Sequence, residues 1–164
     1  MRATTRRQWL AGAAALGLGG VAMRGGEKGE FRVTHTEKQW KEKLTDEQFY
    51  VLRKHGTERA GSSPLNAEKR EGVFKCAGCD QELFESETKF ESGTGWPSFY
   101  APIDGAVGTT KDRSFFMVRT EVHCSRCGGH LGHVFEDGPK PTGLRYCMNG
   151  AAMTFEPEKG GPQS

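Results

Sequence analysis

Residues 114–127 read SFFMVRTEVHCSRC, a predicted strand that runs directly into a pair of cysteines. From Phe116 to Cys124 every second residue would lie on one face, which is the period-2 pattern of a half-buried strand. Shorter strands are predicted at 73–76, 144–148 and 152–155. Because 23 glycines and 7 prolines also mark many turns, the sequence predicts a mainly β, antiparallel domain.

Two short helices are predicted ahead of these strands. Residues 36–43 form the first. The second begins at a capping box, Thr45-Asp46-Glu47-Gln48, and ends at His55-Gly56. Residues 57–72 have no clear period and are predicted to form a long loop, so the helices lie at the N-terminal side of the β domain.

The five cysteines divide into two C-x-x-C pairs and one single residue. Cys76 with Cys79, and Cys124 with Cys127, can supply the four thiolates of one tetrahedral zinc ion. The same spacing is compatible with two disulfides, but disulfides across C-x-x-C are usually catalytic. We therefore predict one structural Zn²⁺ per chain that staples the small domain.

Cys147 is the cysteine left without a partner. Arg145 would lie on the same side of a strand, where it favours the thiolate or holds a carboxylate such as Asp137. His130 and His133 are predicted to lie on a turn and to face one cleft, where a histidine can donate a proton near neutral pH. An inert buried cysteine and structural or metal-binding histidines are the alternatives.

Trp96 lies between Gly95 and Pro97 in a turn-rich stretch. Such flanking residues hold an indole in place while leaving it accessible. Two interpretations are open at this position. Trp96 either belongs to the core or forms the wall of a pocket for a small apolar group.

Residues 1–24 contain four arginines and no acid. Arg6-Arg7, followed by an apolar stretch from Leu10 to about Ala22, indicates a twin-arginine export signal. The stretch is too short and glycine-rich to favour a stable membrane span, although a membrane anchor or a disordered start is the alternative. We predict a signal at 1–24, a linker at 25–35, the domain at 36–157, a flexible tail at 158–164, and a location outside the cytoplasm.

The charge balance argues against a nucleic-acid partner. The whole chain has 23 basic and 21 acidic residues and a net charge of +2. Without the four arginines of the predicted signal, 19 basic residues face 21 acidic ones, a net charge of −2. A zinc-ribbon DNA binder usually carries a basic excess, so this class is disfavoured.

Several longer segments resemble the methionine-R-sulfoxide reductase B family, over about Trp40 to Phe155. They are 89–93 (KFESG), 95–99 (GWPSF), 130–135 (HLGHVF), 137–139 (DGP) and 141–149 (PTGLRYCMN). The resemblance implies a fold of two antiparallel β-sheets. It also implies reduction of methionine R-sulfoxide, in oxidised proteins or peptides, to methionine.

The resemblance further implies roles for the residues singled out above. The Cys147 thiolate would attack the sulfoxide sulfur and become a sulfenic acid. His133, helped by His130, would stabilise or protonate the sulfoxide oxygen. Zinc on the four paired cysteines would be structural. The other implied site residues are Trp96 and Phe135 for substrate binding, and Asn149, Asp137 and Arg145 for orienting and tuning the site.

Three positions depart from the family pattern. Thr94 stands where many members have a resolving cysteine, so a thioredoxin-like or other external thiol is expected to reduce the sulfenic acid. Gly150 stands where serine is usual and is expected to loosen the turn after Asn149. The loop at 59–63 does not follow the usual family wording, which leaves its substrate contacts in doubt.

Two other functions compete with the reductase. A zinc-stabilised binding module without turnover would tolerate replacement of Cys147. A thiol–disulfide oxidoreductase would use one C-x-x-C pair and would bind little zinc. A single reactive thiol beside one bound zinc would exclude the second of these.

Overall fold

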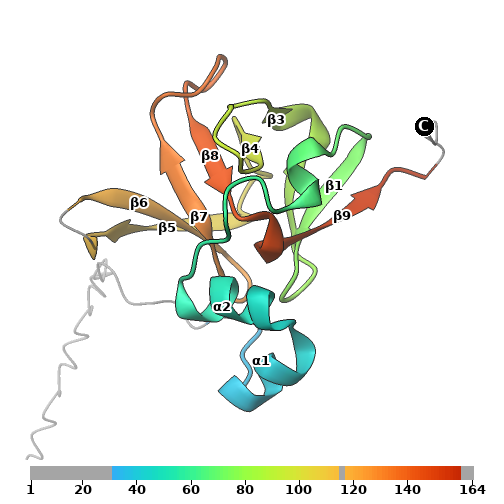
Figure 1. Ribbon diagram of the computed structural model, residues 1–164, viewed down its shortest axis with the longest axis vertical. Coiled ribbons are helices and arrows are strands. Elements are labelled where there is room, and N and C mark those ends of the chain that lie inside the picture. The colour runs from blue at the N-terminus through green and yellow to red at the C-terminus, as the bar shows by residue number, and fades with distance from the viewer. Residues whose placement is uncertain (1–30, 115–116, 160–164) are drawn as a thin grey trace, which may run out of the picture.

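A computed structural model describes residues 31–114 and 117–159 of the chain (Figure 1). These residues form two antiparallel β-sheets with two short helices packed together at one end of the molecule. The mainly β fold with two antiparallel sheets is therefore confirmed. Within the described ranges, no helix is long and apolar enough to cross a membrane.

Both helices begin at capping boxes; the one at Thr45 was predicted from the sequence, and the one at Thr36 was not. Helix α1 spans Glu37–Lys43 behind the N-cap Thr36, and α2 spans Asp46–Lys54 behind the N-cap Thr45. In each box the threonine side chain accepts a hydrogen bond from the N3 backbone amide, while the N3 glutamine accepts one from the cap amide. His55 ends α2 in the left-handed region, at φ 56°. The helices contribute the buried side chains Trp40, Leu44, Phe49, Val51 and Leu52 to the core.

The smaller sheet has three strands in the order β2-β1-β9. The larger has six, in the order β3-β4-β8-β7-β6-β5. Their bounds are β1 Gly72–Cys76, β2 Glu82–Glu85, β3 Lys89–Phe90, β4 Ser98–Phe99, β5 Val107–Asp112, β6 Arg119–Cys124, β7 His130–Phe135, β8 Arg145–Met148 and β9 Met153–Pro157. Short 3₁₀ turns lie at η1 Pro64–Ala67, η2 Ser86–Thr88 and η4 Gly150–Ala152.

Aromatic side chains join the two sheets. Phe74 of β1 and Phe84 of β2 both contact Phe99 of β4, with ring centroids 4.9 and 4.3 Å away. All three side chains are fully buried. Burying a phenylalanine contributes about 1.5–3 kcal/mol, so this contact is a main reason why the sheets pack on one another.

The longest predicted strand is shorter than the sequence suggested. Strand β6 begins at Arg119, which pairs with Asp112 at the end of β5. Asp112 Oδ1 accepts a hydrogen bond from the Ser114 amide at 2.9 Å, so the chain turns there. Met117 and Val118 are 55% and 73% exposed, and Phe116 lies outside the described residues. The apolar alternation before residue 119 therefore does not mark a buried strand face.

The two histidines lie on strand β7, where the sequence predicted a turn. Val122 of β6 pairs with Gly132, whereas the next residue, His123, pairs with His130. Leu131 is thus the extra residue of a β-bulge. In a regular strand, residues three apart point to opposite faces. The bulge shifts this alternation by one residue and brings His130 and His133 within 5.4 Å, measured between ring centroids.

The described part of the predicted linker runs along the domain. The Val33 amide donates to the Arg126 carbonyl at 3.0 Å, and the Phe31 ring packs edge-on against His123 at 5.8 Å. The predicted export signal and residues 25–30 lie outside the described residues, as does the tail after residue 159. The boundaries of these segments stay predictions.

Candidate active site and metal centre

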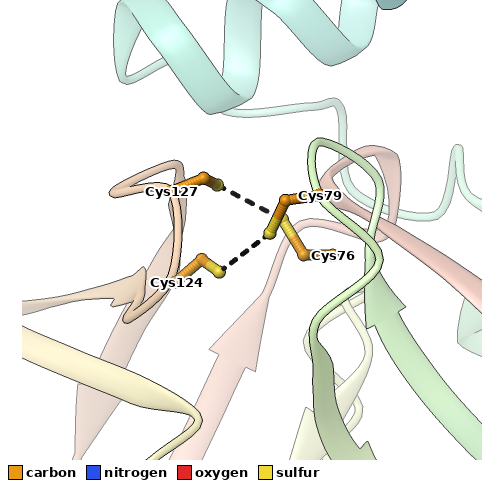
Figure 2. A group of neighbouring side chains, drawn as sticks. All are labelled: Cys76, Cys79, Cys124 and Cys127. Atoms are coloured by element: carbon orange, nitrogen blue, oxygen red, sulfur yellow. Dashed lines mark hydrogen bonds between the residues drawn. The ribbon is translucent and has the colours of Figure 1, made fainter. Parts of the chain in front are cut away.

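The four paired cysteines meet between the two sheets, as Figure 2 shows. Cys76 ends β1 and Cys79 lies in the turn after it, while Cys124 ends β6 and Cys127 lies in the turn after that strand. Each cysteine is at most 6% exposed. The sulfur of Cys76 lies 3.7 Å from that of Cys127, and the sulfur of Cys79 lies 3.6 Å from that of Cys124.

These distances fit a bound metal ion rather than disulfides. A zinc–sulfur distance of about 2.3 Å places neighbouring sulfurs of a tetrahedral shell about 3.8 Å apart, whereas a disulfide requires about 2 Å. All four thiols are free, and their sulfurs lie within 4.8 Å of one another. Four protein ligands close the coordination shell, so an ion held here is structural. Such deep burial also argues against a C-x-x-C redox centre, whose thiols need access.

Cys147 lies near the middle of the six-stranded sheet and is half-buried. It pairs with His133 of β7 on one side and with Ser98 of β4 on the other. Its sulfur lies 3.8 Å from Thr94 Oγ1, which lies 2.8 Å from Ser92 Oγ. Ser92 Oγ in turn lies 2.7 Å from Ser98 Oγ. A chain of three hydroxyl groups therefore leads from the thiol into the interior.

Each site histidine has its own carboxylate partner. His133 Nε2 lies 2.9 Å from Asp112 Oδ2, and His130 Nδ1 lies 2.7 Å from Glu121 Oε1. Burial lowers the pKa of His133, and the hydrogen bond to Asp112 pulls it partly back. The pKa of Asp112 lies far below its usual range, first because of hydrogen bonds from Ser114 and then because of His133.

Asn149 locks the bulge that brings the histidines together. Its backbone amide and its side-chain Nδ2 both donate to the Leu131 carbonyl, at 2.8 and 3.0 Å. Its Oδ1 accepts from the Glu58 amide at 3.0 Å. Both ends of this amide are therefore used, and Asn149 is only 3% exposed. It positions the backbone on both sides of the site.

Glu58 is a buried carboxylate that the sequence did not single out. Its two oxygens accept from the Gly150 and Ala151 amides, each at 2.7 Å. Its carbonyl accepts from Trp96 Nε1 at 3.2 Å. Burial raises the pKa of Glu58, while the two backbone hydrogen bonds oppose the rise. Glu58 thus connects the indole to the turn that follows Cys147.

A shallow pocket of about 130 Å³ opens over Cys147. Gly132 lines it, and strand β8 lies so close there that a Cβ on residue 132 would lie 2.1 Å from the Cys147 carbonyl oxygen. Among the described residues, His130, Arg145 and Asp137 do not line the pocket. Those that do are Thr57, Trp96, Arg119, Gly132, His133, Phe135, Cys147, Met148 and Asn149.

Arg145 and Asp137 brace the pocket from outside. The guanidinium donates two hydrogen bonds to the Asp137 carboxylate, both at 2.8 Å. It also lies over the Phe135 ring, 4.5 Å from its centroid. The hydrogen bonds to Asp137 raise the pKa of Arg145, and the nearby Cys147 adds to the rise. The pair holds Phe135 at the pocket and places a fixed positive charge near the thiol.

The SelR domain, a family model, matches residues 44–157. Over 132 residues the chain is 58% identical to the peptide methionine sulfoxide reductase MsrB of Methanosarcina barkeri, covering 80% of this chain and 93% of that protein. It is 53% identical over 127 residues to the MsrB of Agrobacterium fabrum, with 77% and 94% covered. The chain belongs to the MsrB family. The MsrB of Leptospira interrogans is a further relative, 53% identical over 129 residues.

Within this MsrB domain, three acidic residues of the site were not predicted from the sequence. Asp112 and Glu121 are the partners of the two histidines. A signal for them existed, since buried histidines need acceptors; Asp112 lies just before the predicted strand at 114–124 and Glu121 lies within it. No such signal marked Glu58, which lies in the aperiodic stretch before β1.

Gly150 is held more tightly than the sequence suggested. It is buried in η4, and Glu58 binds its amide. A Cβ at this position would lie 2.0 Å from Ser63 Oγ. Ser63 belongs to the loop at 59–63, whose sequence departs from the family pattern. Two positions that depart from this pattern are therefore in contact. The serine side chain of the loop fills the space beside residue 150, and the expected loosening of the turn is not found.

This contact predicts a compensating pair of substitutions. Gly150→Ser should destabilise the protein by about 1–3 kcal/mol through overpacking. Ser63→Gly alone should cost less, chiefly through the lost hydrogen bond from the Leu65 amide. In the double variant the second change should relieve the first, giving a favourable coupling in urea unfolding. Simple additivity of the two losses would contradict the proposed collision.

Proposed function

We propose that this MsrB-family protein reduces methionine R-sulfoxide, in oxidised proteins or peptides, to methionine. The observation that supports this most directly is the position of Cys147. The half-buried Cys147 thiol belongs to the residue that pairs directly with His133 in the antiparallel β7–β8 ladder. Trp96 and Phe135 line the pocket above it. This arrangement offers a nucleophile, a proton donor and an apolar wall for the substrate's methyl group.

The reaction transfers one oxygen atom. The Cys147 thiolate attacks the electrophilic sulfoxide sulfur and forms a sulfur–sulfur bond with it. The oxygen, protonated in the pocket, then passes to the cysteine sulfur as the S–O bond and the new sulfur–sulfur bond both break. The methionine sulfur keeps an electron pair and leaves as a thioether. Cys147 is oxidised to a sulfenic acid. Arg145 places a fixed positive charge near the reacting sulfur, and Phe135 and Trp96 hold the substrate's side chain.

His133 is the proposed proton donor. Negative charge develops on the sulfoxide oxygen as the thiolate attacks, and a protonated imidazole in the pocket can neutralise it. The Asp112 carboxylate favours the protonated ring and orients it. His130, held by Glu121, packs edge-on behind His133. Its proposed role is to position His133, because it does not reach the pocket.

An external thiol is proposed to complete the cycle. One thiol condenses with the sulfenic acid and releases water, and a second thiol then frees Cys147 from the mixed disulfide. All five cysteines lie within the described residues, and four of them form the metal cluster. Thr94, the neighbour of the Cys147 sulfur, has no thiol to offer. A thioredoxin-like protein or a small thiol therefore supplies the electrons.

We also propose that the metal is zinc and that the protein is exported. Four thiolates in a closed, buried shell are the ligand set of structural zinc. Arg6-Arg7 and the apolar stretch behind them support a twin-arginine signal. This route is associated with proteins that fold before crossing the membrane, so the cluster would be loaded beforehand and arrive with its thiolates protected.

Turnover of a methionine sulfoxide peptide tests both the nucleophile and the epimer that is reduced. With excess dithiothreitol and a methionine sulfoxide peptide, wild type should consume the R epimer and leave the S epimer. Cys147→Ser should abolish this turnover, because an alcohol is a far weaker nucleophile. Its metal content and unfolding transition should match wild type, which is the control for folding. Equal turnover in the variant, or none by metal-loaded wild type, would favour the binding module.

The pH dependence of turnover tests His133 as the proton donor. His133 can donate a proton only below its pKa, which burial lowers and Asp112 raises. Removing Asp112 therefore lowers that pKa further. In Asp112→Asn, the descending limb of kcat/KM against pH should move to lower pH. Asp104→Asn, at an exposed turn, is the matched control and should leave the limb in place. A limb that stays fixed in both variants would exclude His133 as the acid.

The location and the metal content of the protein in cells test the export signal and the zinc site together. Cell fractionation should find wild type outside the cytoplasm without residues 1–24, with one zinc ion per four-cysteine cluster. The variant Arg6→Lys/Arg7→Lys should stay inside and still hold zinc. Export of the variant would contradict the signal. Exported protein that contains disulfides and no zinc would contradict the metal.

A further inference from the structure

A second group of metal-ligand side chains lies beside the proposed active site. It consists of His55, Glu121 and His130, and one ligand atom from each lies within 4.8 Å of the others. Glu121 Oε1 lies 2.9 Å from His55 Nδ1 and 2.7 Å from His130 Nδ1. Two imidazoles and one carboxylate form an open zinc ligand set, which leaves a coordination position for water.

Three separate elements bring these side chains together. His55 ends α2, Glu121 lies on β6, and His130 lies at the start of β7. His55 adopts the left-handed backbone, and its ring lies 5.3 Å from that of His130. The side chains of His130 and Glu121 are 3% and 14% exposed, whereas that of His55 is 65% exposed. Two ligands are therefore fixed inside, and the third closes the group from the solvent side.

The spacing suits an ion after a small adjustment. Zinc–ligand distances of about 2.0–2.2 Å place neighbouring ligand atoms about 3.3–3.5 Å apart. The present nitrogen–oxygen separations of 2.7 and 2.9 Å are those of hydrogen bonds, which the ion would replace as the histidines lose their Nδ1 protons. An opening of roughly half an ångström is needed, and the exposed His55 side chain can provide it.

We propose that His55, Glu121 and His130 form a second, reversible site for a divalent transition metal ion of the Zn²⁺ class. Imidazole and carboxylate ligands suit such ions. Occupation of this site should slow turnover. His130 packs edge-on against His133 at 5.4 Å, and Glu121 stands opposite His133 in the β6–β7 ladder. An ion that moves either ligand therefore disturbs the histidine beside Cys147. The binding itself does not depend on the proposed function; the inhibition does.

Cobalt can test the site in zinc-loaded protein. Wild type with its four-cysteine cluster filled by zinc should bind one further Co²⁺ in calorimetry. The complex should show the weak visible bands of nitrogen and oxygen ligation, without a thiolate-to-cobalt charge-transfer band. His55→Ala should weaken this binding at least ~10-fold, because loss of a residue that only hydrogen-bonds a metal ligand already lowers metal affinity that much. His35→Ala, which removes the exposed histidine that packs on Trp40, is the matched control and should bind as wild type does.

Turnover measured in parallel tests the inhibition. Added Zn²⁺ should slow wild type and His35→Ala, whereas His55→Ala should resist, with an unchanged rate before zinc is added. Binding of no further ion by wild type would overturn the site. So would equally tight binding by His55→Ala, or a thiolate band, which would assign the ion to Cys147. Calorimetry and spectroscopy need no turnover. An inactive protein would therefore overturn the proposed function, while the cobalt measurements would still show whether the metal site exists.

Discussion

Four sulfur atoms hold together parts of the chain that are 45 and 51 residues apart in the sequence. Cys76 ends a strand of the small sheet and Cys124 ends β6 of the large one. The Cys127 carbonyl also accepts a hydrogen bond from Arg53 at 3.1 Å, which fixes α2 to the same place. The sheets and the helices thus share one junction, and β6 extends from it to carry Glu121 and Arg119 toward the pocket. Loss of the cluster would loosen every surface from which the site is built.

The site is assembled through the backbone as much as through side chains. A single carbonyl, that of Leu131, accepts two hydrogen bonds from Asn149 and so fixes the bulge that places both histidines on one side of β7. Glu58 holds the amides that follow Asn149 and the Trp96 indole, which lines the pocket together with Cys147. These buried groups are fully partnered, and each would leave an unpaired polar atom if its partner were removed. Rigidity around the thiol therefore comes from buried hydrogen bonds that join side chains to the backbone.

Local patterns predicted the parts of the fold that local chemistry determines. The capping box at Thr45, the C-x-x-C pairs and the Arg145–Asp137 contact depend on residues whose spacing in the sequence is informative. The bulge at Leu131 was not predictable, because it arises from pairing between β6 and β7 and from a hydrogen-bonding partner 18 residues away. The start of β6 was misplaced for a related reason, since its limit is set by the turn at Asp112 rather than by the apolar residues beside it. Glu58 was invisible because its partners lie more than ninety residues along the chain.

The small size of the pocket limits which oxidised methionines can approach Cys147. Binding sites for drug-sized ligands usually measure about 300–1,000 Å³, whereas this one has about 130 Å³. It has room for the end of one side chain, so the backbone that carries that side chain would lie outside the pocket. An oxidised methionine would therefore have to extend away from its own protein by several bonds before Cys147 could approach its sulfur. Residues on frayed ends, mobile loops and partly unfolded chains meet that demand, and those packed inside an intact core do not. A pocket of this size thus suits oxidised methionines on exposed or mobile segments better than those packed in an intact core.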